Sequence, residues 1–150
     1  MATAFDTFNQ YAEAAYEGQV RDMGAADIVS KLTDEVVEFG RAVVRGAHDN
    51  SIAVPASTED DFAGITVRMT AWDNDASGSA AYPAGKEASV IRKGRVWVRC
   101  WDGCVPGDSV YVIADTGELS SSSYESGEQY VGATWETTAA AGELAVVQLG

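Results

Sequence analysis

The sequence predicts an all-β fold, either a small β-barrel or a jelly-roll-like sandwich, with an N-terminal arm. Short runs rich in β-branched and other apolar residues recur along the 150-residue chain. Turn signals, among them Pro106-Gly107 and Thr116-Gly117, separate these runs. Strands at a spacing of roughly 8–12 residues are typical of sandwiches and barrels, and a chain of this length usually forms one domain. We therefore expect an arm over residues 1–25 and a single β-domain over residues 26–150.

The predicted arm has two interpretations. Aromatic and alanine residues recur at helical spacing in the segment "FDTFNQYAEAAY" of residues 5–16: Phe5, Phe8, Ala12 and Ala15. A short helix explains this spacing, and an extended arm with aromatic anchors explains it nearly as well. Gly18 and Gly24 then interrupt regular structure.

From residue 26 the pattern becomes that of strands. The segment "DIVSKLT" places Ile28, Ser30 and Leu32 on one side of the first strand. The segment "EVVEFGRAVV" predicts two strands that meet at Gly40. The longer segment "SKLTDEVVEFGRAVV" can also be drawn as a helix, in which that glycine costs about 1 kcal/mol. A short strand near residues 51–54 follows, and another over residues 62–72.

The remaining chain is predicted to alternate strands and turns. Residues 73–88 have the composition of a long polar loop, and residues 89–101 return to β-structure. A strand over residues 110–113 lies between the two turn signals, and another follows the second turn. Two strands around Ala141-Gly142 close the chain.

The segment "VIRKGRVWVRC" of residues 90–100 holds four of the ten basic residues. As one straight strand it turns its even positions to the core and presents four side chains on the other face: Lys93, Arg95, Trp97 and Arg99. Alternatively, Lys93-Gly94 is the tip of a two-residue hairpin. In both cases Lys93 and Arg95 are exposed. These cations either balance carboxylates of the same chain or bind an acidic patch on a partner protein.

The charge distribution argues against nucleic-acid partners, and the distribution of apolar residues argues against membranes. The formal net charge is -13, and residues 101–150 contain eight acidic residues and no lysine or arginine. Such a surface repels phosphates, so we expect no nucleic-acid binding. The chain lacks an apolar run of the ~20 residues that span a bilayer, and its N-terminus lacks the features of a signal peptide. We therefore expect that the protein does not contact a membrane. We also expect it to be made in a host cytoplasm.

Catalytic and metal-binding patterns are weak. His48 is the only histidine, and no G-x-S-x-G nucleophile elbow accompanies it. The segment "DNDASG" of residues 73–78 begins like a calcium loop, but Ala84 stands where the bidentate glutamate belongs. Cys100 and Cys104 are too few ligands for zinc, and whether they form a disulfide is left open. We expect neither catalysis nor a cofactor.

Several segments, taken in order, resemble the structural cement (capsid decoration) proteins of tailed bacteriophages. They are "IVSKLTDEVVEFGRAVVRG", "DFAGITVR", "YPAGKEASVIRKGRVWVRC", "PGDSVYV" and "ATWETTAAAGELAVVQL". No single segment is specific, and the resemblance rests on their order and spacing over about residues 18–149. It implies a virion protein on the outer capsid surface that clamps neighbouring major capsid protein subunits after expansion. It also implies a homotrimer at three-fold axes, or else a dimer, and no catalytic residues.

The predicted contact residues are the four on the basic strand and three aromatics of the arm: Phe5, Phe8 and Tyr11. An arm that reaches onto a neighbouring subunit would use these aromatics as anchors. The alternative function is a head-fibre base or a receptor- or glycan-binding β-sandwich. Tryptophans can stack on sugars, and the chain has four: Trp72, Trp97, Trp101 and Trp135. A small hydrolase built around His48 is the least favoured hypothesis.

Overall fold

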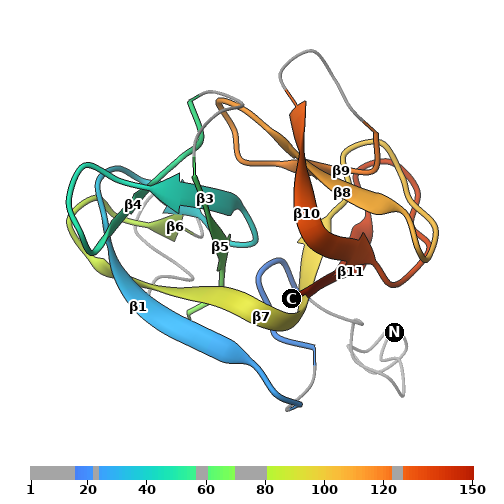
Figure 1. The fold of residues 1–150 in the computed structure, drawn as a ribbon, viewed down its shortest axis with the longest axis horizontal. Coiled ribbons are helices and arrows are strands. Elements are labelled where there is room, and N and C mark those ends of the chain that lie inside the picture. The colour runs from blue at the N-terminus through green and yellow to red at the C-terminus, as the bar shows by residue number, and fades with distance from the viewer. Residues whose placement is uncertain (1–15, 22–23, 57–60, 70–80, 123–126) are drawn as a thin grey trace, which may run out of the picture.

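The structure, a computed structural model, describes residues 16–21, 24–56, 61–69, 81–122 and 127–150. In this part of the chain it shows strands, turns and no helix, so the all-β prediction is confirmed (Figure 1). The strands are β1 (Asp27–Thr33), β2 (Val37–Glu38), β3 (Ala42–Arg45), β4 (Ser51–Ala53), β5 (Phe62–Thr66), β6 (Ala81–Tyr82), β7 (Glu87–Arg99), β8 (Ser109–Ile113), β9 (Leu119–Ser120), β10 (Gly127–Trp135) and β11 (Leu144–Leu149).

A closed five-stranded barrel forms one half of the molecule (Figure 1). The ring runs β1, β4, β3, β5 and β7, and it closes because β1 also pairs with β7. Its interior is filled by one apolar cluster, which we call the barrel core: Val37, Phe39, Val43, Ile52, Tyr82, Ala88 and Val90. The short β2–β6 pair contributes Val37 and Tyr82 to this core.

A second sheet extends from the barrel through β7. The C-terminal half of β7 pairs with β11, and β10, β8 and β9 follow in that order. Barrel strands β3, β5 and β7 turn Ala42, Ile65 and Ile91 outward toward this sheet, where they join a second cluster, the inter-sheet core. Trp135, the largest fully buried side chain, belongs to it. Burial on both faces explains why β3 and β5 carry apolar residues at consecutive positions, as β7 does at Val90 and Ile91.

Strand β7 is one continuous element of 13 residues, so the alternative of a hairpin at Lys93-Gly94 is wrong. The strand instead carries a β-bulge, because Asp27 pairs with Lys93 whereas Ile28 pairs with Ile91. The extra residue inverts which face the following side chains occupy. Val90 therefore faces the barrel core, and Val96 and Val98 face the inter-sheet core. The predicted burial is confirmed for Val90, Val96, Val98 and Cys100, which serve two different cores, whereas Arg92 at the bulge is exposed.

Two details differ from the sequence pattern. The predicted loop over residues 73–88 contains β6, whose Tyr82 is fully buried. Its ring packs edge-on against Phe39 at 5.1 Å between centroids, and its hydroxyl donates a hydrogen bond to the Val67 carbonyl. On β1, Ile28 and Leu32 do share one side, but it is the exposed one.

The end of the predicted arm lies against β7. Val20 forms a β-bridge with Val96, and the Gly18 amide donates to the Trp97 carbonyl at 2.8 Å. Gly18 has φ +78° and passes so close to Arg68 that an added Cβ would lie 2.8 Å from its amide nitrogen. Residues 16–21 are thus anchored on the β-domain. Phe5, Phe8 and Tyr11 lie outside the described residues.

Candidate interaction surface

The basic strand presents its four predicted contact residues along the second half of β7. Lys93 and Arg99 are exposed, whereas Arg95 and Trp97 are half-buried. Trp97 is flanked by the anchored segment, because its amide donates to the Gln19 carbonyl at 2.9 Å. The side chains lie on the predicted face, but the end of the arm covers part of it.

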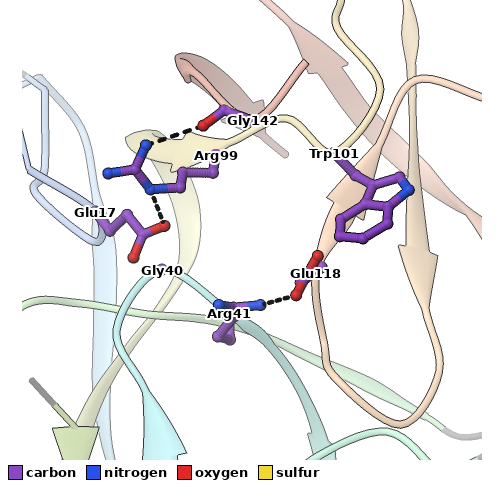
Figure 2. Close-up of a pocket in the computed structure, with 7 residues that line it drawn as sticks. All are labelled: Glu17, Gly40, Arg41, Arg99, Trp101, Glu118 and Gly142. Carbon is purple, nitrogen blue, oxygen red and sulfur yellow. Dashed lines mark hydrogen bonds and ion pairs between the residues drawn. The ribbon is translucent and has the colours of Figure 1, made fainter. Parts of the chain in front are cut away.

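Carboxylates of the same chain lie beside two of these arginines. Arg99 Nε is 2.7 Å from Glu17 Oε1, and its Nη1 donates to the Gly142 carbonyl at 2.9 Å (Figure 2). Arg95 Nε is 4.0 Å from Glu136 Oε2. Exposed ion pairs of this kind contribute about 0–1 kcal/mol each, so they orient the side chains more than they stabilise the fold. They agree with the interpretation that the strand's charges balance the acidic chain.

Lys93 differs from its neighbours on β7. Its ammonium makes no ion pair with any residue in the described ranges, and it is exposed beside the C-terminal Gly150. Lys93 can therefore bind a partner without first breaking an ion pair, unlike Arg95 and Arg99.

A cavity of about 210 Å³ opens at the far end of the basic strand (Figure 2). Two ion pairs line it, Arg99 with Glu17 and Arg41 with Glu118, the latter at 2.8 Å. In the view of Figure 2, Trp101 lies on the same side as Glu118 and opposite Glu17. Its side chain is 54 % exposed. Sequence reasoning missed Arg41 and Glu118, which directly precede β3 and β9, because no local pattern brings these distant segments together.

The three tryptophans in the described ranges do not share an exposed surface that would bind a sugar. Trp135 is only 1 % exposed, and its indole N–H donates to the Ser120 carbonyl at 3.2 Å. Stacking of a sugar on Trp135 would need an exposed indole, so the expectation of sugar stacking is wrong for this residue. Trp97 is half-buried, and Trp72 lies outside the described residues. Trp101 alone among the described tryptophans offers an indole face that is more than half exposed.

The two cysteines are free and buried in the inter-sheet core. Burial raises the pKa of the Cys100 thiol to about 12, and it also raises that of Cys104. The thiolate is the reactive form in disulfide exchange, so both groups are held in the unreactive state. The Cys104 thiol is 3.3 Å from the Thr137 carbonyl, as expected for a packed, weakly polar side chain.

Asp102, in the turn between the cysteines, organises the adjacent loop. Its Oδ1 accepts hydrogen bonds from the Ser121 amide at 2.9 Å and the Ser121 hydroxyl at 3.2 Å. Its Oδ2 accepts one from the Ser122 hydroxyl. Burial alone would raise the pKa of this carboxyl, but the hydrogen bonds from Ser121 and Ser122 outweigh burial and lower it below the usual aspartate value.

This lowered pKa gives Asp102 a defined pH dependence. A carboxyl whose folded pKa is depressed contributes stability above its unfolded pKa and loses it as the pH falls through the folded pKa. We expect Asp102→Asn to be less stable than the original chain at pH 7 and to lose less stability between pH 7 and about pH 3. Urea unfolding at both pH values measures this, with Asp49→Asn, an exposed carboxyl outside the cluster, as the control. Parallel curves for Asp102→Asn and the original chain would contradict it.

The catalytic and metal hypotheses gain no supporting geometry from the described residues. The Ser51 hydroxyl donates to Asp34 Oδ2 at 3.2 Å and accepts from the backbone amide of His48 at 2.9 Å, which is an arrangement that holds a loop. The calcium-like segment at 73–78 lies outside the described residues. Within the described ranges, no cluster of His, Cys, Asp or Glu could hold a metal ion, and no helix is long and apolar enough to cross a membrane.

Comparison with known proteins identifies the fold and the family. Residues 5–150 match the family described as structural cement protein (E217 gp24/Pam3 gp6). A chain in the structure of the capsid of Myoviridae phage XM1 has a TM-score of 0.78 and 20 % identity, over 100 % of this chain and 98 % of that one.

A more distant structural neighbour comes from another part of a phage head. The head fibre gp8.5 N base of bacteriophage phi29 has a TM-score of 0.52 and 14 % identity, over 84 % and 95 % of the two chains. No curated protein sequence matches the chain. At such identities the two structures indicate the shared fold, while the family match covers nearly the whole sequence. The chain therefore belongs to the structural cement protein family of bacteriophages, as a structural β-barrel protein of the virion with a role in capsid decoration.

Proposed function

We propose that the protein binds the outer surface of an icosahedral phage head and clamps neighbouring major capsid protein subunits, which stabilises the expanded shell. The family match over residues 5–150 carries this proposal. A clamp needs contacts on more than one subunit, because several weak contacts made together give high avidity. The closed barrel supports this role, since it leaves no open edge in that half that would pair with stray strands.

The proposed assembly is a homotrimer at three-fold axes, with a dimer as the alternative. Symmetric closure multiplies each contact of the subunit. In this arrangement the arm aromatics Phe5, Phe8 and Tyr11 contact a neighbouring subunit. The proposed arm starts from Gly18, whose amide donates to the Trp97 carbonyl of β7. The basic face of β7, Lys93 with Arg95, Trp97 and Arg99, contacts acidic capsid surface. The protein itself is made in the host cytoplasm.

Charge reversal at Lys93 tests the contact of the basic strand. Arg95 and Arg99 are less suitable, because a new carboxylate there would face Glu136 or Glu17 of the same chain. We expect Lys93→Glu to weaken binding to undecorated heads by roughly fivefold, since a rim charge contributes about 1 kcal/mol. Lys86→Glu makes the same charge change at another exposed position and serves as the control. Equal occupancy of both variants, measured by co-sedimentation with heads, would remove β7 from the contact.

Clamping itself is tested by the heat resistance of heads. Decorated heads are expected to release DNA at a higher temperature than undecorated ones, because each bound copy must be lost before its subunits separate. A protein that binds heads without changing this temperature would be a decoration without a clamp. The head-fibre base is the alternative function, and it predicts occupancy of few lattice positions instead of all equivalent ones.

A further inference from the structure

Three adjoining depressions form a continuous feature that we call the furrow. The first is the cavity of Figure 2, lined by Trp101. The second shares Arg41 and Glu118 with the first, and the third shares Val36 and Asp115 with the second. The Arg41 guanidinium lies at the junction of the first two, held by Glu118 on one side and by Glu38, at 2.7 Å, on the other. Only 19 % of the Arg41 side chain is exposed, so the guanidinium is held in place at the bottom of the furrow.

Exposed apolar side chains lie toward the two ends of the furrow. Trp101 lines the first depression, and Val36, which is 60 % exposed, lines the second and third. Val54, which is half-buried, and Pro55, which is buried, line the third depression beside Val36. Both Trp101 and Val36 lie outside the two cores, so the fold does not account for their apolar surface. Apolar patches with a polar rim are typical of sites that bind other proteins.

The polar rim of the furrow is acidic. Five carboxylates line the three depressions, against two guanidinium groups: Glu17, Glu35, Glu38, Asp115 and Glu118 against Arg41 and Arg99. Both guanidinium groups are already engaged by Glu17, Glu38 and Glu118. The excess negative charge therefore attracts lysine or arginine from outside and repels acidic segments.

We propose that the furrow binds an extended segment of another protein that carries Lys or Arg in its middle and apolar side chains toward its ends. A second copy of this chain is a poor occupant, because its net charge is -13 and its residues 1–15 contain Asp6 and Glu13 but no lysine or arginine. The inference rests on the proposed function, which makes the occupant a segment of the major capsid protein. The furrow then supplies a second contact, opposite in charge to the one at Lys93, as a clamp requires.

Removal of three furrow carboxylates tests the charge contribution. In the variant Glu35→Gln/Asp115→Asn/Glu118→Gln the backbone is preserved, because glutamine keeps an acceptor for the Val54 amide and asparagine tolerates the positive φ of Asp115. The control, Asp49→Asn/Asp61→Asn/Glu87→Gln, removes three exposed carboxylates that line none of the depressions. We expect the furrow variant to bind undecorated heads about tenfold more weakly, with a flatter salt dependence, and the control to bind within about twofold of the original chain.

A second pair of variants tests the apolar ends. Val36→Asp, at a position exposed enough to leave folding intact, is expected to reduce head binding about tenfold. Ile28→Asp, on the exposed side of β1, is the matched control and is expected to bind normally. Equal binding by both furrow variants and the original chain would overturn the furrow while leaving the clamp in place. Failure of the original chain to bind heads would overturn the proposed function, and the occupant assigned to the furrow with it.

Photo-crosslinking identifies the occupant. With benzoylphenylalanine in place of Trp101 or Val36, irradiated decorated heads are expected to yield a crosslinked peptide of the major capsid protein that contains lysine or arginine. Crosslinks to other copies of this chain, or to an acidic capsid segment, would overturn the assignment.

Discussion

Gly64→Ala is expected to destabilise the barrel by about 3–5 kcal/mol, a large part of the 5–15 kcal/mol typical of a domain. Gly64 lies on β5 with φ +146°, a backbone conformation that only glycine adopts without strain. An added Cβ would lie 2.5 Å from the Ile91 carbonyl oxygen and 2.6 Å from Val90 Cγ1. The neighbours cannot yield, because Ile91 and Val90 are fixed by pairing of β7 with β1 and β5. The midpoint of thermal unfolding should fall by roughly 10 °C.

Gly85→Ala is the matched control for Gly64→Ala. Gly85 also has a positive φ, +76°, but an added Cβ would meet nothing within 4 Å. Its replacement should therefore cost only the backbone strain, about 1 kcal/mol. The difference between the two variants in free energy of unfolding therefore measures the steric cost of placing a Cβ where β5 passes close to β7. Equal midpoints for the two would show that β5 does not pass β7 as described.

Trp135→Ala is expected to cost about 3–5 kcal/mol, because it removes the largest side chain of the inter-sheet core and leaves a cavity. It also removes the donor to the Ser120 carbonyl, which leaves a buried acceptor without its partner. Trp101→Ala, at the rim of the furrow, should change stability by no more than about 0.5 kcal/mol. Urea unfolding of the two variants compares them directly. A larger loss for Trp101→Ala than for Trp135→Ala would reverse the assignment of core and surface.

Much of the fold could be predicted from local patterns. The turn residues and β-branched runs located β3, β4, β8 and β11 close to where they lie. The alternation in residues 90–100 correctly assigned Val96 and Val98 to a core and Lys93 to the surface. These features depend on residues a few positions apart, so a single sequence contains the information.

The missed features depend on contacts between distant residues. Tyr82 looks like part of a loop, because its burial depends on Phe39 and Val67 and its own neighbours are polar or turn-forming. The β-bulge in β7 arises only when β1 pairs with it. Likewise, the pairing of Arg99 with Glu17 joins residues far apart in sequence, so the spacing of charges on β7 could not show that they are balanced within the chain.

The candidate surface shows the same division. The sequence correctly placed a basic face on β7. The furrow, in contrast, assembles mainly from the segments that follow β1, β4, β7 and β8 and from the segment before β3. In the sequence, Trp101 is only one of four tryptophans that can stack on sugars, and its exposure beside two buried cysteines is visible only in the structure. In the proposed assembly, the cation at Lys93 and the acidic furrow are two contact surfaces of opposite charge. Such surfaces suit a protein that joins different parts of a shell.

A cryo-EM reconstruction of the mature phage head would show whether the protein clamps the shell. We expect density for this chain on the outer capsid surface at every equivalent lattice position, with each copy contacting neighbouring major capsid subunits. We also expect a basic capsid segment in the furrow at Trp101 and Val36. Density confined to the tail, or copies that each rest on one subunit without bridging to the next, would contradict the clamp.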